Sequence, residues 1–119
     1  MKKYELAYLD EHDVIFLKML DNLEPDEVRN LMKVMGADFK KTNCRRILCD
    51  ISHSGVSISK EARRAFRETS GLVDYEKIAM IGGTPPMRMM AKVILAITGT
   101  SDKTKFFKVK EEALTWLKG

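Results

Sequence analysis

The feature that most constrains this chain is a regular alternation of short apolar segments with longer segments of helical periodicity. Two strands separated by four polar residues at 10–13 predict an antiparallel hairpin, and helix and strand patterns alternate from there onward. This alternation is typical of an α/β protein with right-handed crossovers and a mixed sheet covered by helices. The predicted order is ββαβαβαβα, with strands at 4–9, 14–20, 46–51, 77–81 and 105–109.

Each predicted helix has a start or stop signal in the sequence. Side-chain caps and early prolines favour a helix start, whereas glycine or asparagine favours a stop. The expected boundaries are 24–27 and Asn43 for the first helix, Ser57 or Ser59 and Gly71 for the second, Thr84 and Gly99 for the third, and 111–117 for the last.

Three segments carry a further likeness. RRILCDISHSGVSISKEARRAF is a strand ending in Asp-x-Ser before a Ser-capped helix, YEKIAMIGG is an apolar strand before a loop and a helix, and KTKFFKVKEEALTWLKG ends in an Ala-x-x-Trp-Leu helix. In these segments the chain resembles the STAS-like group, small bacterial domains related in fold to anti-sigma-factor antagonists and to CRAL-TRIO lipid carriers. The resemblance implies a SpoIIAA-like fold and, within the group of unassigned function, no established reaction.

The resemblance also implies a candidate regulatory serine. In the antagonists, a serine at the start of the helix after the central strand is phosphorylated, which switches binding to a kinase partner. Ser57 or Ser59 stands in the equivalent place here. The family setting is Asp-Ser-Ser-Gly, whereas residues 56–60 read Val-Ser-Ile-Ser-Lys, without the aspartate and the glycine.

Polar side chains crowd the loop after the central strand. A catalytic triad needs side chains that converge in space, and near neighbours in an extended segment diverge. Turn formation and helix capping explain the same residues, so we expect no catalytic group and no enzyme. The two cysteines and two histidines have no metal-ligand spacing, so we expect no metal and no cofactor. The candidate loop residues are Asp50, Ser52, His53, Ser54, Ser57 and Ser59.

Composition excludes several other classes of function. The 119 residues predict a single domain, 1–119, and the 21 basic and 17 acidic residues are interleaved, with a formal net charge of +4. The interleaving disfavours nucleic-acid binding, which usually requires a basic block. The sequence has neither a signal peptide nor an apolar run of about 18 residues, so we expect a cytoplasmic protein without a membrane span.

The loop before the third predicted helix raises the question of anion binding. Gly82, Gly83 and Thr84 precede a helix start, where backbone N–H groups can hold a phosphate. Pro85 and Pro86 remove two of those N–H groups, and a tight turn followed by a threonine cap explains the same residues. Because ligands in open α/β sheets bind beyond the carboxyl ends of strands, this loop and the loop at 50–59 form the default candidate site.

The third helix is more apolar than a helix covering one face of a sheet needs to be. Only Arg88 and Lys92 interrupt the apolar run at 87–97, and methionine adapts well to irregular partners. The helix is therefore either deeply packed or part of a dimer or partner surface, an apolar ligand cavity or a membrane contact. The candidate surface consists of Met87, Met89, Met90, Val93, Ile94 and Ile97.

Two hypotheses about function follow. The first is a non-enzymatic, STAS-like regulatory domain that binds a protein partner or forms a homodimer. The alternative is a carrier or sensor of a small apolar or lipid-like molecule, held in a cavity between the third helix and Met32 and Met35 of the first.

Overall fold

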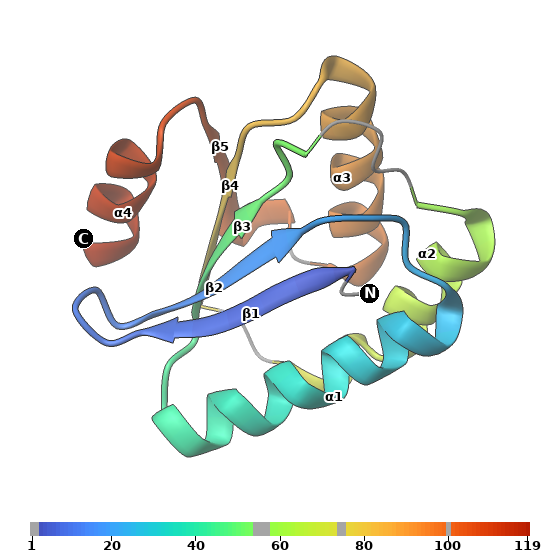
Figure 1. The fold of residues 1–119 in the computed structure, drawn as a ribbon, viewed down its shortest axis with the longest axis horizontal. Helices are drawn as coiled ribbons and strands as arrows, with labels where there is room; N and C mark the ends of the chain where they lie inside the picture. The colour runs from blue at the N-terminus through green and yellow to red at the C-terminus, as the bar shows by residue number, and fades with distance from the viewer. Residues whose placement is uncertain (1–2, 54–57, 74–75, 100) are drawn as a thin grey trace.

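The fold is a five-stranded mixed sheet with helices on both faces (Figure 1). A computed structural model describes residues 3–53, 58–73, 76–99 and 101–119. The strand order is β1-β2-β3-β4-β5; β1 and β2 form an antiparallel hairpin and the other neighbours are parallel. The predicted order ββαβαβαβα is confirmed. The strands are Tyr4–Leu9, Val14–Met19, Arg46–Asp50, Lys77–Ile81 and Thr104–Phe107, and helices α1 to α4 are Pro25–Thr42, Lys60–Glu68, Pro85–Thr98 and Lys110–Lys118.

The core lies in two layers, one on each face of the sheet. Helices α1, α2 and α3 cover one face, and α4 covers the other (Figure 1). Side chains of a strand alternate between the faces, so Ile47 and Cys49 of β3 face the larger layer while Leu48 packs under α4. This two-sided burial explains why β3 and β4 are almost continuously apolar in sequence.

The helix signals predicted at Asn43, Thr84 and Gly99 act where they were expected. Asn43 ends α1 in the left-handed conformation, with φ 57°, and Gly99 ends α3 in the same way, with φ 75°. The hydroxyl of Thr84 accepts a hydrogen bond from the backbone N–H of Met87, and Pro85 opens α3. These boundaries follow from local backbone chemistry, which is why the sequence reveals them.

Two predicted boundaries are wrong by two residues or more, and several others differ by one residue. Helix α2 ends at Glu68 rather than near Gly71, because the Thr69 hydroxyl bonds the carbonyl oxygen of Ala65 and a 3-10 turn, Ser70–Leu72, follows. The last strand ends at Phe107 rather than at 109. Phe107 pairs with Ile81, the final residue of β4, so the chain beyond it has no strand to pair with.

Among the described residues, no helix combines the length and the apolar character needed to cross a membrane.

Candidate functional site

The described residues that directly follow β3 lie against those that follow β4, at the carboxyl ends of the two strands. The backbone N–H of Ile51 donates a hydrogen bond to the carbonyl oxygen of Ile81, at 3.0 Å. Gly82 has φ +77°, and a Cβ atom there would collide with the backbone and side chain of Ser52. The close approach therefore requires glycine for both its conformation and its size.

The polar groups of the first loop are used to build the loop itself. The Asp50 carboxylate accepts hydrogen bonds from the Ser52 backbone N–H, at 2.9 Å, and from its hydroxyl, at 2.5 Å. This is a local Asx-type turn. Ser52 and His53 are exposed, whereas Ser54 and Ser57 lie outside the described residues. Asp50 thus orients the turn that follows β3.

The two histidines are placed at opposite ends of the sheet. His12 lies in the turn that precedes β2, and His53 follows β3. Because β2 and β3 run parallel, the start of one and the end of the other are far apart. No group of three His, Cys, Asp or Glu side chains is placed to hold a metal ion within the described part of the chain.

Ser59 is the N-cap of α2. Its side-chain oxygen accepts a hydrogen bond from the backbone N–H of Ala62, at 3.1 Å, and its side chain is exposed. Lys60 and Arg63 follow within the first turn. An exposed hydroxyl at a helix N-terminus is an electrostatically favourable place for a phosphate group.

The loop before α3 offers few free donors. Pro85 and Pro86 lack N–H groups, and the N–H of Met87 is bonded to Thr84. The guanidinium of Arg88 turns back and donates to the carbonyl oxygen of Gly82, at 3.1 Å. These contacts stabilise the turn and leave little of an anion cradle around Gly83.

Helix α3 divides into an inner and an outer apolar face. Met87 and Ala91 are buried against the sheet, whereas Met89 is 70% exposed and Val93 is 45% exposed. Deep packing therefore accounts for one side of the helix only. Met90 and Ile94 are half-buried between the two faces, and the side chain of Ile97 lies outside the described ones.

Ion pairs and ring contacts show how α2 and α3 are oriented. Arg29 of α1 pairs with Glu68, at 3.3 Å, so the Glu68 side of α2 faces α1. At about 100° per residue, Arg63 then lies on the flank opposite Glu68, toward α3, whereas the exposed Arg67 points mainly outward. On α3, the Lys92 ammonium lies 5.6 Å from the centre of the Phe106 ring, so that side faces β5.

The outer side of α2 thus carries cationic side chains, and the outer side of the neighbouring α3 carries apolar ones. We call the two together the α2–α3 surface: Arg63 and Arg67 on α2, and Met89, Met90 and Val93 on α3. Together the two helices carry six basic and two acidic residues, which is an excess of four positive charges. This excess equals the formal net charge of the whole chain, +4. One of the acids, Glu68, is already paired with Arg29.

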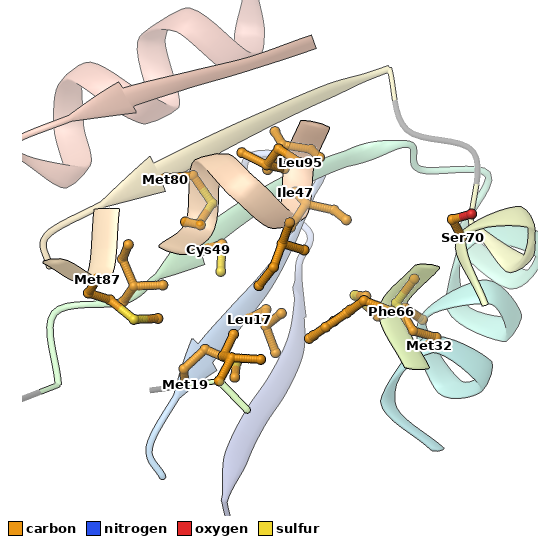
Figure 2. A pocket seen from close by; sticks show the side chains of 16 residues that line it. Leu17, Met19, Met32, Ile47, Cys49, Phe66, Ser70, Met80, Met87 and Leu95 are labelled. Atoms are coloured by element: carbon orange, nitrogen blue, oxygen red, sulfur yellow. The ribbon is translucent and has the colours of Figure 1, made fainter. Parts of the chain in front are cut away.

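Beneath this surface lies an apolar pocket of about 100 Å³ between the sheet and α1, α2 and α3 (Figure 2). Met32 and Met35 of α1 and Met87 of α3 are among the residues that line it. Met19 and Met80, on β2 and β4, were missed, although strand alternation places both on the α1–α3 side. The sixteen lining residues are Leu17, Met19, Met32, Met35, Ile47, Cys49, Ile51, Ile58, Phe66, Ser70, Ile78, Met80, Met87, Ala91, Ile94 and Leu95.

Residues 8–119 match the family described as Domain of unknown function (DUF7793). The chain belongs to the DUF7793 family. No curated protein matches the sequence. The family assignment therefore carries no function with it.

Solved structures show the same fold. An uncharacterised protein of the DUF3478 family from Shewanella loihica, with a SpoIIAA-like fold, has a TM-score of 0.72 and 17% identity over 98% of this chain and 95% of that one. The unphosphorylated form of the anti-sigma factor antagonist SpoIIAA has a TM-score of 0.64 and 11% identity, over 98% of this chain and 96% of that one. An anti-sigma factor antagonist from Mycobacterium paratuberculosis has a TM-score of 0.61 and 14% identity, over 98% of this chain and 95% of that one. The STAS-like, SpoIIAA-like fold expected from the sequence is confirmed.

Proposed function

We propose that this DUF7793 chain is a non-enzymatic regulatory domain that binds an acidic protein partner through its α2–α3 surface. The observation that supports this most is the exposed pair Met89 and Val93 on a helix that neighbours α2 and its arginines. Exposed apolar side chains near basic groups fit a partner with apolar anchors and a carboxylate rim. The structural likeness to anti-sigma factor antagonists supports a regulatory role.

Charge argues for a different protein as the partner rather than a second copy. In a two-fold dimer the same surface meets itself, so Arg63 and Arg67 would face the same two positive charges of the second chain. A membrane is also a weaker fit. A helix that lies in a bilayer interface buries its apolar face in lipid, whereas the main apolar face of α3 already packs on the sheet at Met87 and Ala91.

Ser59 is the proposed switch. Phosphorylation adds a charge of about −1.5 to −2, and here it would do so at the start of α2, next to Lys60 and Arg63. The added charge would cancel much of the positive surface and weaken binding to an acidic partner. In this proposal Asp50, Ser52 and the loop Gly82–Thr84 shape the turns after β3 and β4 and do not contact the partner.

The first test is crosslinking in the native cells. A photo-reactive p-benzoylphenylalanine replaces Met89, and the control replaces Val34, an apolar residue of α1 that is 39% exposed. We expect a discrete protein adduct from position 89 and none of the same mass from position 34. Identical adducts at both positions, or adducts with the chain itself only, would contradict the proposal.

The second test uses the purified partner. Met89→Asp and Arg67→Glu should each weaken binding at least tenfold, and Val34→Asp should not. Ser59→Asp should weaken it in the same direction as phosphorylation. Higher salt should reduce affinity, since exposed charge pairs are screened. Co-sedimentation with anionic vesicles, lost in Met89→Asp, would assign the surface to a membrane instead.

The pocket under the same helices favours a second candidate function, which we propose alongside the first: carrying or sensing a small apolar molecule. The supporting observation is a pocket of about 100 Å³ whose wall comes from three helices and three strands. Native mass spectrometry of gently purified protein tests it. A retained mass that disappears on denaturation is the expected result, and consistently empty protein from native cells would argue against this function.

A further inference from the structure

We propose that the pocket beneath α2 and α3 binds a compact, neutral, apolar molecule or group about the size of one aromatic ring. This inference rests on the second candidate function and names the chemical class of its ligand. It does not depend on the binding of a protein partner at the α2–α3 surface.

The polarity of the wall sets the class of ligand. Of the sixteen lining residues, Ser70 alone carries a hydroxyl, and that hydroxyl donates to the carbonyl oxygen of Arg67, at 3.0 Å. The other hetero atoms are methionine sulfurs and the thiol of Cys49. Burial raises the pKa of Cys49 to about 12, so the thiol is neutral. A charged or hydrogen-bonding ligand would lose water and find no partner here.

The volume of the pocket limits the size of the ligand. A dry apolar cavity of about 150 Å³ in another protein holds one benzene molecule, and the pocket here measures about 100 Å³. Five methionines form part of its wall, at positions 19, 32, 35, 80 and 87. Methionine is unbranched and adapts its shape at little cost. A single ring therefore fits after a small adjustment of side chains, whereas a long acyl chain does not.

Access is from the side between α2 and α3. Of the lining residues, Phe66, Ser70, Ile94 and Leu95 keep partial exposure, while the others are buried. In Figure 2, Phe66 and Ser70 lie on the α2 side of the pocket and Leu95 lies on α3. A ligand would pass between these helices without opening the sheet.

The methionines provide a direct readout. In protein labelled with 13C at the methionine methyl groups, benzene is the probe. We expect saturable ring-current shifts at the five lining methionines and no saturable shift at Met89, which lies outside the pocket. Absence of any saturable shift up to the solubility limit of benzene would overturn the proposal, as would a response centred on Met89.

Benzoate and one matched pair of variants complete the test. Benzoate keeps the ring but adds a charge, so it should bind at least tenfold more weakly than benzene; equal binding would overturn the assignment to neutral ligands. Ala91→Leu fills the pocket from α3 and should abolish the benzene shifts, whereas Ala96→Leu, on the exposed side of the same helix, should preserve them. If Ala91→Leu fails to fold, the comparison of benzene with benzoate on the unmodified chain decides the question.

The outcome is separable from that of the carrier or sensor function. A charged or long-chain ligand retained from native cells in this pocket would uphold that function and overturn the class proposed here. Specific benzene binding by a chain that retains nothing from cells would uphold the class of ligand and contradict the function.

Discussion

The ammonium nitrogen of Lys77 lies 3.0 Å from the carbonyl oxygen of Trp116 and 5.0 Å from the centre of its indole ring. Lys77 begins β4, and Trp116 lies in the last turn of α4. The positive charge thus meets both an unpaired helix carbonyl and the face of an aromatic ring. This contact fixes the end of α4 on the sheet face opposite the proposed sites.

Replacing Lys77 with Met should loosen α4 and lower the free energy of unfolding by about 1–2 kcal/mol, from the lost hydrogen bond and cation–π contact. Trp116 is the chain's single tryptophan, so its fluorescence reports on this contact directly. We expect a red-shifted emission in the folded variant. Lys33→Met, at an exposed position of α1, is the control, and an equal change in both variants would contradict the explanation.

Removing the cap of α2 should destabilise the fold moderately. Ser59→Ala loses the hydrogen bond to the Ala62 N–H and should cost about 1 kcal/mol, whereas Ser59→Asp keeps an acceptor and should stay near the unmodified stability. Urea denaturation measures both. The explanation fails if alanine and aspartate are equally destabilising.

Gly82 should tolerate alanine less well than Gly99 does. Both have φ near +75°, where a side chain costs about 1–2 kcal/mol. A Cβ at Gly82 also meets Ser52, whereas a Cβ at Gly99 has no atom of the described residues within 4 Å, its chain neighbours and its own helix apart. Thermal unfolding of Gly82→Ala and Gly99→Ala should therefore show the larger loss for Gly82→Ala, and the reverse order would contradict the packing of the two loops.

Part of the acid sensitivity should come from Glu27. Its carboxylate accepts hydrogen bonds from the Glu24 N–H, at 2.8 Å, and from the Lys3 ammonium, at 3.0 Å, and these hold its pKa below the ordinary 4.5. Because the pKa is lower in the folded state, the carboxylate stabilises the fold above pH 4.5, and this contribution is lost as the pH falls through the lowered value.

Between pH 7 and pH 3, the melting temperature of Glu27→Gln should accordingly fall less than that of the unmodified chain. Glu112→Gln, at an exposed position of α4, serves as the control and should leave the pH profile unchanged. A profile of Glu27→Gln that parallels the unmodified chain would show that this carboxylate does not contribute.

The sequence determined the elements because their signals are local. The hairpin, the strand–helix alternation, the threonine cap at 84 and the stops at Asn43 and Gly99 each depend on a few neighbouring residues. The proline pair after Thr84 likewise indicated a helix start with few anion donors. The three segments that resemble STAS-like domains then sufficed to identify the fold.

The tertiary structure decided how these elements face one another. Met87 and Met89 are both methionines and lie two positions apart, yet Met87 is buried against the sheet and Met89 is exposed. Strand β5 ends where β4 ends, which no signal within residues 104–109 could indicate. The pocket is built from residues between Leu17 and Leu95, so its volume and polarity exist only once three helices pack on the sheet. Local chemistry fixes where an element begins and ends, but burial depends on neighbours distant in the chain, and the two proposed sites are made of such neighbours.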